Sequence, residues 1–587
     1  MLKLIKNFGK KEWVYILTSF FLIFGQVWLE LKMPDYMAEI TKLVQTKGSL
    51  IKDIVINGSY MLLCAFGSLI LAVIVGYLVA NLSSAFSMNL RKKVFSKVES
   101  LSLNEVKMFS TSSLITRTTN DISQIEMFLA MGLQLLIKAP ITAIWAVTKI
   151  FNKNLEWSIL TAIAVGILLS VVGVLIAIVM PKFKIVQRLT DKLNLVTRQN
   201  LTGIRVVRAF NAEKYQEEKF NEVNTKLTNQ QLFNQKTFAI FSPIMYLVMN
   251  LLTLGIYYIG ADLIDSALMA DKITLFGNMV VFSAYAMQVI MSFLMLAMIF
   301  MILPRAQVSA TRINEVLDTN VTIVDGNIDK SNSKEKGIVE FKNVSFKYPD
   351  AEEYLLKNIS FKVNKGETIA FIGSTGSGKS TLINLVPRFY DATEGEVLVD
   401  NINVKDYKLE TLYNKLGYVA QKAVIFSGTI TENVGYGESG KKITKDKIKE
   451  AIKVAQASSF VEKMDNQYDT HLAQGGTNVS GGQKQRLSIA RAIARDPEIY
   501  IFDDSFSALD YKTDAVLRSE LKKYTKDATV LIVAQRIGTI MNADKIVVLD
   551  NGNCVGMGTH KELLETCEIY KQIALSQLSK EELEHES

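Results

Sequence analysis

The segment Gly373-Ser374-Thr375-Gly376-Ser377-Gly378-Lys379-Ser380 lies between an apolar run, Thr368–Ile372, and a helical run, Thr381–Val386. A strand, a glycine-rich loop and a helix in this order are the context that a P-loop requires. Glycines allow backbone N–H groups to converge on phosphate oxygens, and the helix N-terminus adds positive potential. We therefore expect this segment and Thr381 to bind a nucleotide, with Lys379 reaching the β- and γ-phosphates and the Ser380 hydroxyl ligating Mg²⁺.

A carboxylate with a matching role follows later in the chain. Ile499–Asp503 is an apolar, strand-like run that ends in an acid. Such a strand is a weak signal alone, but downstream of a P-loop it predicts that Asp503 holds Mg²⁺ through water. Alternating strand-like and helical stretches throughout residues 338–587 predict an α/β nucleotide-binding domain.

A third motif, Val479-Ser480-Gly481-Gly482-Gln483, stands between these two. It resembles the signature motif of ATP-binding-cassette (ABC) proteins. Other positions fit the same family: Tyr348 resembles the aromatic residue that stacks on adenine, Gln421 the Q-loop glutamine, and Ser507–Asp510 the D-loop. The resemblance implies ATP and Mg²⁺ as ligands, with Gln421 beside Ser380 and Asp503 at the metal.

The resemblance also implies a dimer. In this family two cassettes associate head to tail, and each ATP lies between one chain's P-loop and the other chain's signature. The motif from Val479 to Gln483, at a helix N-terminus, would then meet the γ-phosphate of ATP bound to the partner.

Residues 1–319 contain nearly all the long apolar runs. A membrane span needs about 20 mostly apolar residues. Six runs qualify, and we expect an all-α membrane domain, although Lys138 interrupts the third run. The six runs are residues 13–33, 57–80, 130–150, 157–180, 238–261 and 273–302.

The basic residues of the short loops predict an orientation. Segments 1–12, 81–129 and 181–237 carry 4, 6 and 11 Lys and Arg residues, whereas loops 34–56, 151–156 and 262–272 carry 3, 1 and 1. The positive-inside rule then places both termini in the cytoplasm. Much of the net charge of +8 is therefore explained by topology, which weakens a nucleic-acid-binding interpretation.

The two large inner segments are long and helical in pattern, and each contains a charged, turn-prone patch. One patch contains Arg117 and Asp121, and the other contains Arg205 and Arg208. A solvated helical hairpin would explain them, but they could also contact a cytoplasmic motor. Together with the six spans they resemble the transmembrane domain of a bacterial ABC exporter half-transporter. Residues 320–337, rich in Asp, Asn, Ser and Lys, are the expected linker.

Three positions depart from the family pattern. At the position of Asp504, directly after Asp503, the family usually has Glu, which orients and deprotonates the attacking water. It usually has His at the position of Gln535, to contact the γ-phosphate. A third departure is Gln474, where Glu is frequent. Asp504 alone could reflect drift, but two coordinated losses predict a degenerate ATP site in one half of a heterodimeric exporter.

The transported substrate is less evident. The sixth span carries interleaved methionine and phenylalanine residues, typical of adaptable binding surfaces, although packing would also explain them. Gln26, Glu30 and Lys138 are polar in an apolar context, where such residues often face a cavity, although Glu30 and Lys138 could also lie near a membrane interface. We expect export of amphipathic drugs, with lipid, peptide or haem as alternatives. The interleaved residues are Met279, Phe282, Met287, Met291, Phe293, Met295, Met298, Phe300 and Met301.

Composition excludes several classes of protein. With 49% apolar and 21% charged residues the chain is not disordered. The three cysteines are far apart in the sequence and exclude a disulfide framework, and the presence of only three histidines argues against a histidine-based metal site. A homodimeric exporter and a regulatory, non-transporting ABC membrane protein stay open. The six spans argue against soluble ABC proteins of translation or DNA repair.

Overall fold

The computed structural model describes residues 2–6, 8–46, 48–151, 155–329, 336–437 and 443–578. The chain divides into two compact units. The first comprises Met1–Glu99 and Phe109–Thr319, and the second comprises Ser100–Met108 and Asn320–Ser587. The second unit thus includes a short piece of the membrane half, which contains helix α4 (Leu103–Met108).

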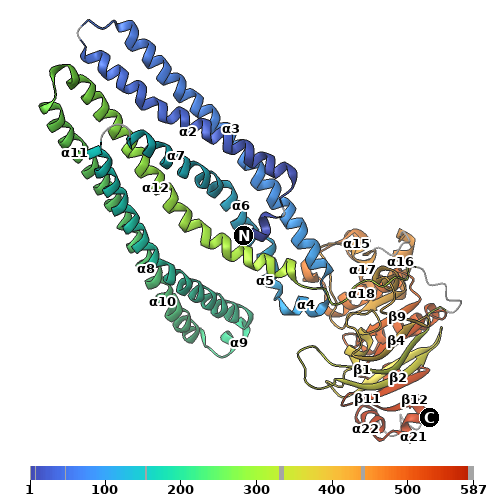
Figure 1. The fold of residues 1–587 in the computed structure, drawn as a ribbon. Helices are drawn as coiled ribbons and strands as arrows, with labels where there is room; N and C mark the ends of the chain where they lie inside the picture. Colours follow the sequence, from blue (N-terminus) through green and yellow to red (C-terminus); the bar gives the residue numbers. More distant parts are fainter. Residues whose placement is uncertain are drawn as a thin grey trace. The chain divides into compact units, whose positions relative to one another are not determined.

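The first unit is built from long helices, drawn from blue to green in Figure 1. Among the described residues, six stretches are long and apolar enough to cross a membrane, which confirms the predicted six-span architecture. A helix of 50 residues such as α3 is about 75 Å long, whereas the hydrocarbon core of a bilayer is about 30 Å thick. The helices therefore extend beyond the apolar layer. The principal helices are α2 (Lys10–Gln45), α3 (Ile51–Ser100), α7 (Leu133–Phe151), α8 (Leu155–Thr202), α10 (Glu213–Ala239), α11 (Phe241–Ser266) and α12 (Met269–Asp318).

The third span is continuous despite Lys138. The helical path runs from Thr111 to Phe151 and contains a π-helical turn, Phe128–Gly132. Lys138 does not break it, because its ammonium group pairs with Glu30 of α2 at 2.9 Å. An intramembrane charge is tolerated where a partner satisfies it.

The second unit is an α/β domain, which confirms the predicted fold class. Its larger sheet has the order β12-β11-β3-β10-β9-β6, in which all neighbours except β12 and β11 are parallel. Its strands are β3 (Thr368–Gly373), β6 (Leu416–Val419), β9 (Ile499–Asp503), β10 (Thr529–Val533), β11 (Lys545–Asp550) and β12 (Asn553–Gly558). An antiparallel sheet of order β2-β1-β4-β5 completes the domain, with strands β1 (Val339–Phe346), β2 (Leu356–Val363), β4 (Glu394–Val399) and β5 (Ile402–Asn403).

The topology of the larger sheet places the site. Strands β3, β10 and β9 are adjacent and parallel, with Val533 aligned to Phe371 on one side and Asp503 on the other. In open α/β sheets ligands bind outside the carboxyl ends of the strands. The P-loop, Asp503 and the loop after β10 therefore emerge at the same edge.

The segment expected as a linker packs on the second unit where the structure describes it. The Gly326 and Ile328 N–H groups donate to the carbonyl oxygens of Tyr407 and Asp406, both at 2.9 Å. The Thr322 hydroxyl donates to Glu105 of α4 at 2.6 Å. Residues 320–329 are therefore attached to the nucleotide domain, and residues 330–335 of the expected linker lie outside the described range.

Candidate functional site

The phosphate-binding loop has the geometry that its glycines permit. Gly376 and Gly378 have φ values of +87° and +95°, a left-handed region that favours glycine. A Cβ on Gly378 would also lie 2.7 Å from a methyl carbon of Leu356. The loop leads directly into α13 (Lys379–Asn384), so its backbone N–H groups and the helix N-terminus can converge on an anion.

Lys379 folds back over this loop. Its ammonium group donates to the carbonyl oxygens of Gly373 and Ser374 at 2.9 and 2.7 Å. Burial lowers the pKa of Lys379, and the carboxylates of Asp504 and Asp503 oppose that shift. These contacts hold the ammonium group beside the glycine-rich loop, and its expected contact with the β- and γ-phosphates stays a prediction.

Two oxygen ligands suited to Mg²⁺ meet beside the lysine. The Ser380 hydroxyl donates to Asp503 Oδ1 at 2.7 Å, although the two residues are 123 positions apart. Burial raises the pKa of Asp503, and the hydrogen bond from Ser380 opposes the rise. Hydroxyl and carboxylate oxygens are ligands that Mg²⁺ accepts. The residues present therefore fit the expected metal, which would neutralise phosphate charge at this point.

Asp504 is the centre of a hydrogen-bonded cluster. Its Oδ2 atom accepts from Gln535 Nε2 at 2.8 Å and from Gln421 Nε2 at 3.2 Å. Burial raises the pKa of Asp504, and hydrogen bonds from Gln421 and Ser507 oppose the rise. Its backbone has a φ of +48°. The structure thus brings two of the three departures from the family pattern, Asp504 and Gln535, into direct contact.

Tyr348 lies beside the P-loop helix. Its hydroxyl is 3.0 Å from the Thr381 hydroxyl, and its ring meets those of Phe346 and Tyr390 edge to face. Lys107 was not predicted from the sequence. Its ammonium group lies 5.1 Å from the centre of the Tyr348 ring and 5.3 Å from that of Tyr390. No local sequence signal marks it, because the contact joins α4 to residues more than 200 positions away.

We expect the change Tyr348→Ala to weaken nucleotide binding to this chain. Loss of a stacking partner typically costs about 1–3 kcal/mol in base recognition, which corresponds to an affinity weaker by a factor of roughly 5 to 150. Titration of the purified chain with a fluorescent ATP analogue measures the change. Tyr348→Phe is the matched control, since it keeps the ring and removes only the hydroxyl near Thr381. Equal affinity in all three proteins would place the adenine elsewhere.

The signature segment forms the start of helix α18 (Gly481–Ala494). The Ser480 hydroxyl accepts from the Gln483 N–H group, and the Gln483 side chain accepts from the Ser480 N–H group at 2.8 Å. This reciprocal cap fixes the helix N-terminus. Val479 is buried, whereas Gly481 is exposed and a Cβ there would meet no atom within 4 Å. The segment therefore presents an open helix N-terminus to solvent.

The two expected coupling patches differ in their surroundings. Arg117, in α5 (Thr111–Thr118), pairs with Glu315 of α12 at 2.8 Å. Asp121, in α6 (Asn120–Met127), accepts a hydrogen bond from Ser309 of α12 at 2.9 Å. Both are buried, so these side chains secure α5 and α6 to α12 and do not form an exposed patch.

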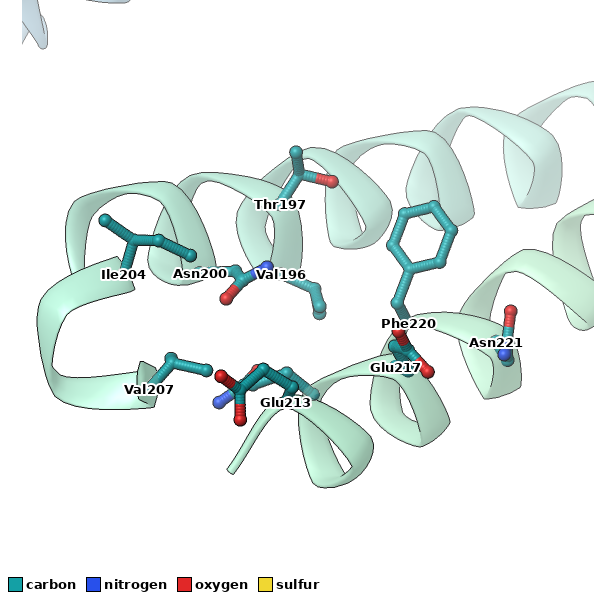
Figure 2. Close-up of a pocket in the computed structure, with 10 residues that line it drawn as sticks. Val196, Thr197, Asn200, Ile204, Val207, Glu213, Glu217, Phe220 and Asn221 are labelled. Carbon is teal, nitrogen blue, oxygen red and sulfur yellow. The ribbon is translucent and has the colours of Figure 1, made fainter. Parts of the chain in front are cut away.

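The second patch is exposed. Arg205 and Arg208 lie on α9 (Ile204–Ala209), which joins α8 to α10 at the end of a long hairpin (Figure 1). A cavity of about 460 Å³ lies between these helices. Figure 2 shows the side chains that line it, among them Asn200 and Glu213. Its lining combines apolar, neutral polar and acidic side chains, namely Val196, Thr197, Asn200, Ile204, Val207, Glu213, Gln216, Glu217, Phe220 and Asn221.

Comparison with known families supports this architecture. The model of the ABC transporter transmembrane region matches residues 16–293, and the ABC transporter model matches residues 356–507. The chain is 38% identical over 558 residues to an uncharacterised ABC transporter ATP-binding protein of Mycobacterium tuberculosis, with 93% of each chain covered. It is 36% identical to a similarly described protein of Bacillus subtilis, with 86% of each covered.

Two further similarities concern proteins with more specific descriptions. The chain is 32% identical to an ATP-dependent lipid A-core flippase of Haemophilus influenzae, with 89% of each chain covered. A solved structure of a bacterial Atm1-family ABC exporter with ATP bound superposes with a TM-score of 0.82. It is 23% identical, and 96% of this chain and 99% of that chain are covered. At that identity the similarity shows the fold.

Proposed function

Because this chain belongs to the ABC transporters, as a half-transporter that joins a transmembrane region to an ATP-binding domain, we propose that it is one subunit of a heterodimeric bacterial exporter. Its own P-loop site binds ATP with Mg²⁺ and hydrolyses it poorly. Its signature segment, Val479–Gln483, completes a competent site whose P-loop belongs to a different chain.

One observation carries the proposal, namely the contact between Asp504 and Gln535. The Asp504 side chain is one methylene shorter than that of Glu, which places its carboxylate roughly 1.5 Å farther from the attacking water. General-base catalysis requires the base within hydrogen-bond distance of that water. The carboxylate also accepts from Gln535 at 2.8 Å. A neutral amide in this position holds the carboxylate but supplies no positive charge to a γ-phosphate. General-base chemistry at this site is therefore weak.

The other half of the proposal rests on what is retained. The groups that we expect to bind ATP and Mg²⁺ are all present, namely the loop conformation, Lys379 and the Ser380–Asp503 pair. The start of α18 is capped and exposed, so it could contact a phosphate bound to another chain. This site therefore keeps the groups that bind nucleotide but lacks a well-placed general base and the histidine usual at the position of Gln535. Such a site is suited to hold ATP while the opposite site hydrolyses it.

We expect Asp504→Asn to change ATP turnover of the assembled heterodimer less than threefold or so, because it removes a base that already contributes little of the usual factor of about 10²–10⁴. The measurement is phosphate release by the complex in proteoliposomes. The chain purified alone should show little hydrolysis. Vigorous hydrolysis by a homodimer, lost on Asp504→Asn, would contradict the heterodimer proposal and make Asp504 a working base.

Coupling and orientation belong to the same proposal. Exposed Arg205 and Arg208 on α9 would contact a nucleotide domain, while Arg117 and Asp121 would transmit movement to α12 through their contacts with Glu315 and Ser309. The basic inner segments support cytoplasmic termini in a cell-membrane protein.

For the substrate, we propose an amphipathic drug or a lipid-like compound. Met291 and Met298 are exposed along α12, whereas Met279 and Phe282 are buried in the helical core. Phe293 lines two apolar cavities of about 440 and 200 Å³. The flippase relative named above supports a lipid-like substrate. The side chains of Phe300 and Met301 lie outside the described part of the chain.

A further inference from the structure

Three helices of the membrane half meet at the carboxylate of Glu30. Its Oε1 atom accepts from Lys138 Nζ of α7 at 2.9 Å, from Gln26 Nε2 one turn earlier in α2 at 2.9 Å, and from Ser68 Oγ of α3 at 3.2 Å. The side chains of Glu30 and Lys138 remain 18% and 24% exposed. The ion pair is thus enclosed by protein but not sealed.

Membrane physics limits what the exposed parts can face. Charged side chains within spans are expensive and almost always face the bundle interior or a water-filled cavity. Glu30 and Lys138 lie within stretches that can cross a membrane, Lys10–Gln45 and Thr111–Phe151. We therefore expect the exposed part of the pair to face the interior of the helical bundle or a water-filled path and not the lipid hydrocarbon.

The pair retains capacity for further bonds. Among the described residues, each hydrogen bond given for the Glu30 carboxylate is accepted by Oε1, which leaves Oε2 available to a cation. An ammonium has three N–H donors, and Lys138 uses one of them on Glu30. One carboxylate oxygen and two N–H donors side by side complement a group that carries both a positive and a negative charge.

We propose that Glu30 and Lys138 form a head-group subsite for zwitterionic amphipaths on the transport path. The inference rests on the proposed export function and names its substrate class. The cationic group of the substrate binds Glu30 and its anionic group binds Lys138. The substrate thus replaces part of the ion pair between Glu30 and Lys138. Phe24 and Trp145 of the same two helices, with ring centroids 4.8 Å apart, supply aromatic surface for an apolar body, and Phe24 is exposed.

A second ion pair between α2 and α7 offers a matched control. Asp35 Oδ2 accepts from Lys149 at 2.8 Å, but Asp35 Oδ1 also accepts from the buried Tyr285 hydroxyl at 2.7 Å. Both carboxylate oxygens are engaged by protein groups. This pair therefore fastens α2 to α7 and α12, and its loss should affect stability without affecting the choice of head group.

The test measures binding without turnover. The full chain is placed in nanodiscs without nucleotide and titrated with three fluorescent amphipaths of identical tail and zwitterionic, cationic or anionic head. We expect Glu30→Gln to weaken binding of the zwitterionic and cationic probes about tenfold and to spare the anionic probe. Lys138→Met should weaken the zwitterionic and anionic probes and spare the cationic one. Asp35→Asn should leave the order of the three affinities unchanged.

A double variant controls for the charge that each single variant leaves unpaired. Glu30→Gln with Lys138→Met removes both charges and should bind the three probes with similar affinities. A preference for the zwitterion that survives in the double variant would overturn the subsite, as would an equal loss of all three probes in the single variants. Because ATP is absent, these outcomes do not depend on which of the two ATP sites hydrolyses nucleotide, so they can fail or succeed separately from the proposed degenerate site. A preserved probe order in Asp35→Asn with reduced thermal stability would support the division between the two pairs.

Discussion

Replacing Gly481 by Asp should lower ATP turnover of the assembled transporter by at least about a hundredfold. Gly481 begins α18, is exposed, and has room for a side chain. An acidic residue is favourable at a helix N-terminus, so the change should not harm folding. In the complex, however, its carboxylate would confront the γ-phosphate held by the partner's P-loop, and loss of one such stabilising contact typically costs about 10²–10³ in rate.

Two measurements separate this effect from damage to the protein. Nucleotide binding to the chain's own P-loop should be unchanged, since Gly481 does not serve that site. Gly481→Ala adds bulk without charge and should be milder than Gly481→Asp. Ser480→Ala should also be severe, because it removes the cap of α18 and, in the proposed complex, a hydroxyl that would contact the partner's nucleotide. Turnover near that of the unmodified complex in Gly481→Asp would show that this segment does not face a hydrolysed ATP.

Restoring the usual residues, with Asp504→Glu and Gln535→His together, should raise hydrolysis at this chain's own site by about 10²–10⁴-fold. Glu extends the carboxylate by one methylene toward the attacking water. His replaces the amide that now donates to Asp504 at 2.8 Å and can carry a positive charge. The measurement is single-site phosphate release by the purified chain, or by a complex whose opposite site is disabled.

The single variants show whether the two positions act as a unit. Because Asp504 and Gln535 are in contact, their effects should be non-additive, with each change alone giving only a small part of the gain. Some loss of stability is expected from Asp504→Glu, since Asp504 has a φ of +48°, where Asp is more common than Glu. If the double variant hydrolyses no faster than the unmodified chain, the weakness of this site lies elsewhere.

The architecture could be predicted from the sequence because its signals are local. Each of the six apolar runs and the Gly373–Ser380 loop lies within at most 30 consecutive residues, and the structure contains the corresponding helices, strand and loop. The signature segment is equally local, since its cap joins residues three positions apart. The identity of Asp504 and Gln535, and hence the prediction of a weak site, also required no coordinates.

Only the tertiary structure decided the contacts between segments that lie far apart in the chain. Lys107 meets Tyr348, Glu30 meets Lys138, and Gln535 donates to Asp504. Arg117 and Asp121, expected at a coupling surface, are buried against α12. Helical periodicity gives the face on which a side chain lies, but not the distant helix that packs against that face. Which charges are paired, and which retain bonding capacity for a ligand, therefore depends on packing that no short stretch of sequence contains.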